Sequence, residues 1–254
     1  MTLSTLNMFT FSWIGLAIAV HVTMFFIKAP FGRHTSTKYG RSINNKLGWF
    51  LMELPSLLIM GYFLFFGSKS LYSYTWILFL MWILHYFNRT VIYPLRIKST
   101  DKKMPLFIVL NAVIFNLFNA GLNGYFLAEL ADGANYADAW LSSPHFIIGS
   151  SLFFIGMAIN WTSDTLLIGL RKKGETGYQI PKGFLFDLIS SPNLFGEIIE
   201  WTGFAILAWN LPALSFAIWT FANLVPRALN HHQWYNDKFP DYPKNRKAVF
   251  PYIF

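Results

Sequence analysis

Cysteine is absent from the 254-residue sequence, and charged residues make up only 13% of it. Without cysteine the chain can form no disulfide scaffold, no thiolate metal site and no cysteine nucleophile. Hydrophobic residues account for 54% and aromatic residues for 19%, and the mean hydropathy is +0.40. This composition excludes a disordered or coiled-coil chain and disfavours an ordinary soluble domain. It predicts a protein that lies in a membrane.

Familiar nucleotide and metal motifs are also missing. No two of the 17 glycines stand two residues apart, so neither G-x-G-x-x-G nor a kinase-type glycine loop can occur, and there is no Walker A motif. Apart from His231 and His232 the six histidines are scattered, and no H-E-x-x-H occurs, which disfavours a catalytic metal. Every lysine lies outside the apolar runs or at their ends, which excludes a retinal-binding photoreceptor. A nucleotide would have to be held in some other way.

Apolar runs long enough to cross a membrane dominate what is present. A hydrocarbon core about 30 Å thick needs about 20 apolar residues in a helix. The sequence has seven such runs, near 8–27, 47–66, 72–93, 105–130, 144–168, 194–209 and 211–230. Asn210, Leu211 and Pro212 stand between the last two runs and predict a tight helical hairpin. We expect one all-α domain over residues 1–254, a bundle of seven transmembrane helices.

The basic residues indicate the orientation of this bundle. All but one of the 20 lysines and arginines lie in or beside the segments 28–46, 94–104, 169–193 and 231–254. Seven spans place these segments on one side, which the positive-inside rule makes cytoplasmic. The exception is Lys69, on the side that carries Glu129. We therefore expect the N-terminus outside and the C-terminus in the cytoplasm. The net charge of +8 is then explained by membrane topology and does not indicate nucleic-acid binding.

Polar residues recur at helical spacing near the cytoplasmic ends of four spans, where ionisable groups are costly and by default functional. Guanidinium groups bind phosphate, carboxylates and amides accept hydrogen bonds from ribose, and rings stack on bases. Together they suit a phosphorylated nucleotide; taken singly, each also suits an interfacial anchor or an interhelical hydrogen bond. The residues are Tyr86, Arg89 and Tyr93; Asn160, Asp164 and Arg171; Asn193, Glu197 and Glu200; and Arg227, His231 and Tyr235.

Glu53 differs because its neighbours in the second run are apolar and no basic residue is near it in sequence. Apolar surroundings favour the neutral carboxylic acid, which can donate a hydrogen bond to a substrate oxygen. The alternative is a structural pairing with a polar group of another helix, and Tyr86 is a candidate for that partner or for a second donor. In the fourth run Asn111, Asn116, Asn119 and Asn123 share one face, which is typical of interhelical hydrogen bonding.

Over its whole length the sequence resembles the steroid 5α-reductase family. The ELPS and HYFNRT segments around Glu53 and Tyr86 carry the more specific part of the likeness. The C-terminal half also resembles sterol reductases, enoyl-CoA reductases and isoprenylcysteine methyltransferases. The matching segments are ELPS (53–56), HYFNRT (85–90), GMAIN (156–160) with SD (163–164), RKKGE (171–175), YQIP (178–181), NLFGEIIEW (193–201) and DYPKNRK (241–247).

This resemblance implies a membrane reductase that saturates the Δ4 double bond of a 3-oxosteroid with NADPH. It implies that Glu53 and Tyr86 contact the C3 carbonyl and that hydride reaches C5. It assigns the cofactor to Arg89, Tyr93, Asn160, Asp164, Arg171, Tyr178, Asn193, Glu197, Arg227, His231 and Tyr235. The sequence departs from many members at Gln179, Phe31 and Met52, where they have a basic residue, a tyrosine and a glutamine.

Several further expectations concern substrate, partners and location. We expect Trp201 and Phe216, with His21, to form a slot for a flat lipophilic substrate, and the basic loops 30–46 and 171–190 to cover the nucleotide. Lipid contact and a monomer are expected, with no nucleic acid and no metal. The lack of cysteine and of a C-terminal dilysine signal favours a prokaryotic cytoplasmic membrane over the endoplasmic reticulum.

Three alternative functions stay open on the sequence alone. A reductase of a polyprenol or an enoyl-CoA would share most of these features. An S-adenosylmethionine-dependent membrane methyltransferase would share the C-terminal pattern but has no evident need for a buried acid at Glu53. A transporter of a lipophilic molecule would also use buried charges, although no inverted internal repeat is visible.

Overall fold

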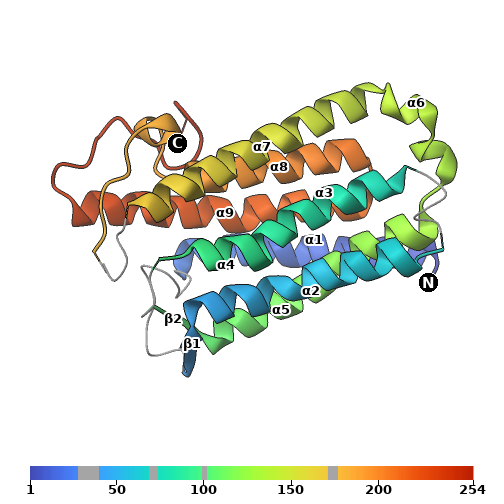
Figure 1. Ribbon diagram of the computed structural model, residues 1–254, viewed down its shortest axis with the longest axis horizontal. Coiled ribbons are helices and arrows are strands. Elements are labelled where there is room, and N and C mark those ends of the chain that lie inside the picture. The colour runs from blue at the N-terminus through green and yellow to red at the C-terminus, as the bar shows by residue number, and fades with distance from the viewer. Residues whose placement is uncertain (28–39, 69–73, 99–101, 171–176, 254) are drawn as a thin grey trace.

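The computed structural model describes residues 1–27, 40–68, 74–98, 102–170 and 177–253, and in this part of the chain long helices run side by side (Figure 1). Among the described residues, each of the predicted apolar runs is largely helical. The long helices are α1 (Leu3–Phe26), α2 (Asn45–Phe66), α3 (Thr75–Phe87), α5 (Leu106–Tyr125), α7 (Pro144–Gly169), α8 (Pro192–Ala208) and α9 (Leu211–Lys238). The expected all-α class is therefore confirmed.

Shorter elements extend or connect these helices. The π-helical turn η3 (Asn88–Ile92) continues α3 into α4 (Tyr93–Arg96), and η4 (Phe126–Leu130) extends α5. A two-stranded antiparallel ribbon pairs β1 (Ser42–Asn44) with β2 (Lys103–Pro105), which joins the start of α2 to the start of α5. The remaining short elements are η5 (Gly133–Tyr136), α6 (Asp138–Leu141) and η6 (Phe184–Asp187).

By length and composition, four helices among the described residues are suited to cross a membrane. They are Leu3–Phe26, Asn45–Phe66, Leu106–Leu130 and Pro144–Gly169. In the third predicted span the α-helix stops after 13 residues and continues as a π-helical turn. Helix α8 has 17 residues and is largely buried, while the C-terminal part of α9 is polar. The protein is an integral membrane protein, and the count of seven spans and its orientation stay predictions.

The predicted hairpin between the last two runs is confirmed. Helix α8 ends at Ala208, and Trp209 adopts a left-handed conformation with φ of 45°. Asn210 then caps α9, its side chain accepting a hydrogen bond from the backbone of Ala213 at 2.9 Å. Pro212 lies in the first turn of α9, where the N–H group it lacks has no partner within the helix.

Helices α7 and α8 pack with their backbones almost in contact. Gly149 and Gly156 on α7 face Leu207 and Gly196 on α8. A Cβ atom added at Gly149 would lie 2.5 Å from the Leu207 nitrogen, and one added at Gly156 would lie 2.5 Å from the Gly196 oxygen. Small residues of this kind let membrane helices approach closely. The close approach brings the polar residues of α7 and α8 within hydrogen-bonding distance.

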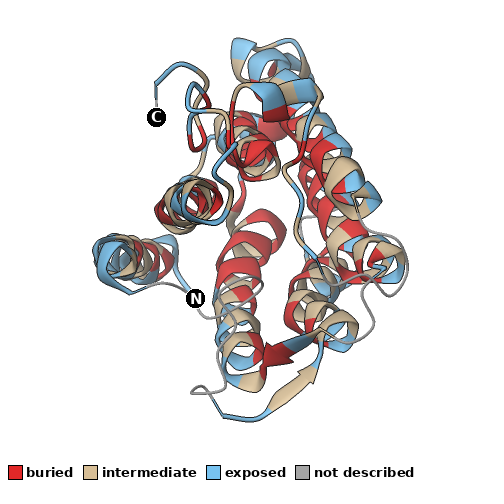
Figure 2. Ribbon diagram, turned by 90° about the vertical axis from the view of Figure 1, so that its left-hand side faces the viewer, coloured by how far each residue is buried: buried red, intermediate tan, exposed pale blue. Residues whose placement is uncertain are grey.

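Buried residues lie on the inner faces of the helices, and exposed residues lie mostly on the outer faces (Figure 2). Aromatic rings fill the centre of the bundle: the rings of Trp201 and Phe216 lie 4.2 Å apart, and Trp82 lies 5.0 Å from Trp201. Many large apolar side chains on the outside are exposed, among them Phe65, Phe66 and Leu95. An apolar exterior around a packed interior is expected of helices that face lipid.

Candidate active site

The predicted polar stripes meet inside one end of the bundle. Glu53 is in the first half of α2, Arg89 is in the turn η3 that follows α3, and Asp164 is near the end of α7. Glu197 belongs to the first half of α8, and Arg227 to the second half of α9. Because long helices that are consecutive in the chain run in opposite directions, these positions come to the same end, where the ribbon and the C-terminus also lie (Figure 1).

Arg89 is the centre of this cluster. Its Nη1 atom donates to Oδ2 of Asp164 at 2.9 Å. Its guanidinium also lies over two rings, 4.7 Å from that of Trp49 and 4.8 Å from that of Tyr93. Stacking and pairing together fix the orientation of the planar guanidinium group. Arg89 is therefore held in one position by three different helical segments.

A row of amides continues the cluster from α7 to α8. Asn193 Nδ2 donates to Oδ1 of Asp164 at 3.2 Å. Asn160 Nδ2 donates to the backbone oxygen of Asn193 at 2.9 Å and lies 3.5 Å from Oε2 of Glu197. Electrostatic interactions link Glu197 to Arg89 and to Arg227. The structure thus brings together six of the predicted cofactor residues: Arg89, Asn160, Asp164, Asn193, Glu197 and Arg227.

Glu53 faces the interior of the bundle and not the lipid. Its Oε2 atom accepts from Nδ2 of Asn116 on α5 at 3.3 Å. Tyr86, which is 4% exposed, donates from its hydroxyl to Oδ1 of the same amide at 3.4 Å. The two predicted catalytic residues therefore meet through Asn116. Our sequence interpretation gave Asn116 a structural role, and only its place on the polar face of α5 could have signalled more.

A second pair in the interior joins Glu200, a member of one predicted polar stripe, to His85, which belongs to none of the predicted stripes. Nδ1 of His85 lies 2.8 Å from Oε1 of Glu200, and their side chains are 3% and 0% exposed. The ring of His85 packs 5.1 Å from that of Tyr86 and 4.8 Å from that of Trp201. The spacing of Glu197 and Glu200 predicted that Glu200 faces inward. It could not predict that His85 on α3 is its partner.

Other predicted residues lie further along the same end. The ring of Tyr93 packs 5.0 Å from that of Trp49. Tyr178 packs against Trp234 with their ring centres 4.9 Å apart. Tyr235 stacks on Tyr242 at 5.1 Å, and His231 lies in the same part of α9. Arg171 and Phe31 lie outside the described residues, as do residues 30–39 and 171–176 of the two predicted covering loops.

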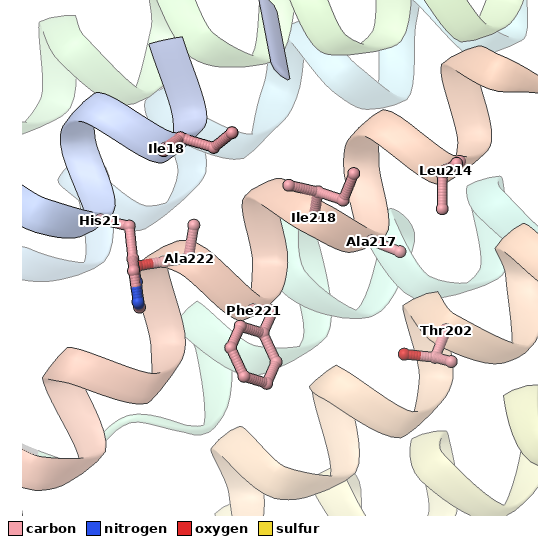
Figure 3. Close-up of a pocket in the computed structure, with 8 residues that line it drawn as sticks. All are labelled: Ile18, His21, Thr202, Leu214, Ala217, Ile218, Phe221 and Ala222. Atoms are coloured by element: carbon pink, nitrogen blue, oxygen red, sulfur yellow. The ribbon is translucent and has the colours of Figure 1, made fainter. Parts of the chain in front are cut away.

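The structure places the three residues of the expected substrate slot in two different surroundings. Trp201 and Phe216 pack in the aromatic centre, 1% and 4% exposed. His21 instead lines a groove of about 380 Å³ between α1, α8 and α9, where its Nδ1 lies 2.8 Å from the oxygen of Ala222 (Figure 3). The groove is lined by Ile18, His21, Thr202, Leu214, Ala217, Ile218, Phe221 and Ala222. His21 therefore does not share a slot with the other two residues.

Comparison with known proteins shows the family to which this chain belongs. Residues 102–254 match the family model described as 3-oxo-5-alpha-steroid 4-dehydrogenase. Steroid 5-alpha-reductase DET2 of Gossypium hirsutum is 39% identical over 244 residues, which are 94% of this chain and 93% of the relative. The chain belongs to the steroid 5-alpha-reductase family.

Animal relatives in this family are equally similar. 3-oxo-5-alpha-steroid 4-dehydrogenase 1 of Bos taurus is 40% identical over 247 residues, covering 94% of this chain and 93% of the relative. The human protein of the same name is 39% identical over 228 residues, covering 88% and 86%. The range matched by the family model contains Asn116 and the amide row but neither Glu53 nor Tyr86. The resemblance inferred from the sequence is thus confirmed at the level of the family.

Proposed function

We propose that this protein is an NADPH-dependent 3-oxo-5α-steroid 4-dehydrogenase, which saturates the Δ4 double bond of a 3-oxosteroid. The observation that carries the proposal is the meeting of Glu53 and Tyr86 at Asn116, inside the bundle and next to the Arg89 cluster. Relatives named for this activity are about 40% identical over nearly the whole chain.

The proposed role of Glu53 and Tyr86 is to bind the C3 carbonyl oxygen. A neutral carboxyl group and a phenol can both donate hydrogen bonds to that oxygen. Such donors draw electron density from the enone, make C5 electrophilic and stabilise the enolate that develops during reduction. The apolar rings around Tyr86, those of Trp82 and Trp201, exclude water, and electrostatic stabilisation is stronger in a dry site.

The chemistry of the Arg89 cluster fits a phosphorylated dinucleotide. Arginines suit phosphate, while carboxylates and amides suit ribose hydroxyls and a carboxamide. Among the described residues, Oδ1 of Asn160 is buried and accepts no hydrogen bond. A buried acceptor without a donor is costly, and a ligand with an N–H or O–H group would satisfy it. When bound here, NADPH would supply the hydride; the chain's own residues would bind it and orient it toward Glu53 and Tyr86.

Two departures from the family pattern have different consequences. Gln179 is exposed, so replacing a basic residue there removes a positive charge from the surface near Tyr178. The Met52 side chain is buried with Met104 and Val109, and it offers Glu53 no polar neighbour. Asn116 supplies such a neighbour from α5 instead. We propose that the pocket around Glu53 therefore differs in shape from that of members with glutamine at this position.

The membrane arrangement belongs to the same proposal. We infer seven spans with the cofactor cluster at the cytoplasmic end, because the basic residues gather there. A lipophilic ketone dissolved in the bilayer could then reach Glu53 while the water-soluble cofactor enters from the cytoplasm. The monomeric state and the prokaryotic origin expected from the sequence stay predictions.

The deciding experiment is turnover by the purified protein with NADPH and testosterone or progesterone. We expect a product reduced at C4 and C5 with 5α stereochemistry. Equilibrium binding provides a second test: the protein should prefer NADPH to NADH and to S-adenosylmethionine. Binding of S-adenosylmethionine alone would favour the methyltransferase alternative, and no binding of any of the three would favour a transporter. Polyprenol and enoyl-CoA, offered in parallel, test for the nearest competing substrates.

A further inference from the structure

Asn116 contacts both residues that the proposed function assigns to the ketone. Its side chain is 3% exposed. Nδ2 donates to the backbone oxygen of Met52 at 2.6 Å and to Oε2 of Glu53 at 3.3 Å. Oδ1 accepts from the hydroxyl of Tyr86 at 3.4 Å. One amide therefore uses both of its N–H groups and its oxygen to join α2, α3 and α5.

We propose that Asn116 is a positioning residue, which orients the Glu53 carboxyl and the Tyr86 hydroxyl before the substrate binds. The inference rests on the proposed function, because it gives Asn116 a part in binding the ketone through these two groups. It adds a third residue to the pair that the sequence predicted. Asn116 itself is not assigned to the substrate.

The amide determines which oxygen of Glu53 can donate. Since Nδ2 of Asn116 donates to Oε2, that oxygen acts as an acceptor. A proton on the neutral carboxyl is then left on Oε1, the oxygen free to face a ketone. Turning the amide over would place Oδ1 against the carbonyl oxygen of Met52, and two acceptors repel. The bond to Met52 thus fixes the direction of the amide and, through it, the position of the proton.

The same bond steadies a weakened turn of α2. Pro55 lies inside the helix and has no N–H group to donate to the carbonyl oxygen of Leu51. The turn that carries Glu53 therefore lacks one of its hydrogen bonds. The short bond from Asn116 to the Met52 oxygen ties this turn to α5. Preorganisation of this kind lets a site bind the transition state without rearranging at the moment of reaction.

The contact between Asn116 and the Tyr86 hydroxyl is a long one. A separation of 3.4 Å is longer than the usual range for an O–H···O bond, which is about 2.5 to 3.0 Å. A ketone oxygen at a normal distance would be a better acceptor than Oδ1 of Asn116. Ser56 on α2 also hydrogen-bonds with this hydroxyl, so Asn116 and Ser56 hold it together. The long bond to Asn116 can then be exchanged for one to the substrate at small cost.

Asn116→Leu tests the inference, because leucine is similar in size and makes no hydrogen bond. We expect kcat for steroid reduction to fall roughly tenfold to a hundredfold, less than for loss of a direct donor. KM for the steroid and Kd for NADPH should stay within about threefold of the wild type. Asn111→Leu is the matched control: Asn111 is exposed on the same helix and donates to Phe107 of its own helix, so kcat should not change.

Asn116→Asp keeps the inference testable if the leucine variant fails to fold. Aspartate has the shape of asparagine but presents oxygen where the amide donates, so kcat should fall at least as far as in Asn116→Leu. A merely structural role would lower NADPH binding and thermal stability together with kcat, whereas a positioning role lowers kcat alone. Loss of NADPH binding in step with kcat in the aspartate variant would therefore overturn the inference.

The remaining outcomes separate this inference from the proposed function. Wild-type protein that reduces no 3-oxo-Δ4-steroid would overturn the proposed function and this inference with it. An active wild type whose folded Asn116 variants keep kcat within about threefold would overturn the inference alone. An equal loss of kcat in Asn111→Leu would also overturn it, because the effect would then belong to α5 as a whole.

Discussion

Arg89 and Asp164 face each other across the interior, with Nη1 of one 2.9 Å from Oδ2 of the other. The side chains are 12% and 5% exposed. The pair joins the π-helical turn after α3 to the end of α7, and Asn193 on α8 bonds to the second carboxylate oxygen. An arginine held by a carboxylate and two rings is oriented before a ligand arrives.

Arg89→Lys should weaken NADPH binding by roughly tenfold, about 1.4 kcal/mol. Lysine keeps the charge but loses the planar fork and its stacking on Trp49. Equilibrium binding of NADPH measures the change. Arg96→Lys is the control, because Arg96 bonds to Thr165 at the exposed surface, and its Kd should equal that of the wild type. Equal Kd values for both variants would contradict a cofactor role for Arg89.

Glu53→Gln should reduce turnover by a factor on the order of 100 to 1000, as expected for loss of one donor to a developing oxyanion. NADPH affinity should be nearly unchanged, because Glu53 belongs to the ketone side of the site. Steady-state kinetics and cofactor binding on the same preparation test both statements. Glu129→Gln provides the control, since Glu129 accepts from Ser68 at the opposite end of the bundle. A fully active Glu53→Gln enzyme would reject the assignment.

Gly156→Ala should destabilise the protein by about 1 to 3 kcal/mol or more, because overpacking forces the backbones apart. The added methyl group would meet the backbone of Gly196 and Glu200 on α8. Gly121→Ala is a matched helical control with no atom within 4 Å of the added carbon, and alanine's higher helix propensity should make it neutral or slightly stabilising. Melting temperatures in detergent compare the two; equal values would show that α7 and α8 can separate freely.

High pH should destabilise the protein through Tyr136, which lies in η5 and outside the predicted spans. Burial raises the pKa of its hydroxyl from 10 to about 12, and it donates to the oxygen of Ala208 at 2.7 Å. The folded state keeps this proton longer than the unfolded state. The contribution of the Tyr136 hydroxyl to stability is therefore complete below pH 10 and is lost as the pH rises to about 12. The loss is up to about 1.4 kcal/mol for each pH unit.

Melting temperature as a function of pH measures this effect. Tyr136→Phe removes the titrating group, so the part of the alkaline decline that Tyr136 causes should disappear in the variant. The variant should also be less stable at neutral pH, by about 1 kcal/mol for the lost hydrogen bond. An identical decline in both proteins between pH 10 and 12 would contradict the prediction.

Helical spacing in the sequence predicted which polar residues of the candidate site share one face of a helix. Spacing along single helices placed Asn160 with Asp164 and Asn193 with Glu197, and the structure brings these two pairs together. A helix that repeats every 3.6 residues fixes which of its own residues share a face. It does not fix how far that face is turned toward a neighbour, so the bond between His85 and Glu200 was not predicted.

The apolar runs and basic loops by themselves determined that this chain is a helical membrane protein, because the thickness of a bilayer and the distribution of positive charge can be read residue by residue. The tertiary structure alone decided that Asn116, one of four similar asparagines on α5, joins Glu53 to Tyr86. The physical reason is that contacts between helices depend on their rotation and depth, which close packing across the whole bundle sets and no single helix contains.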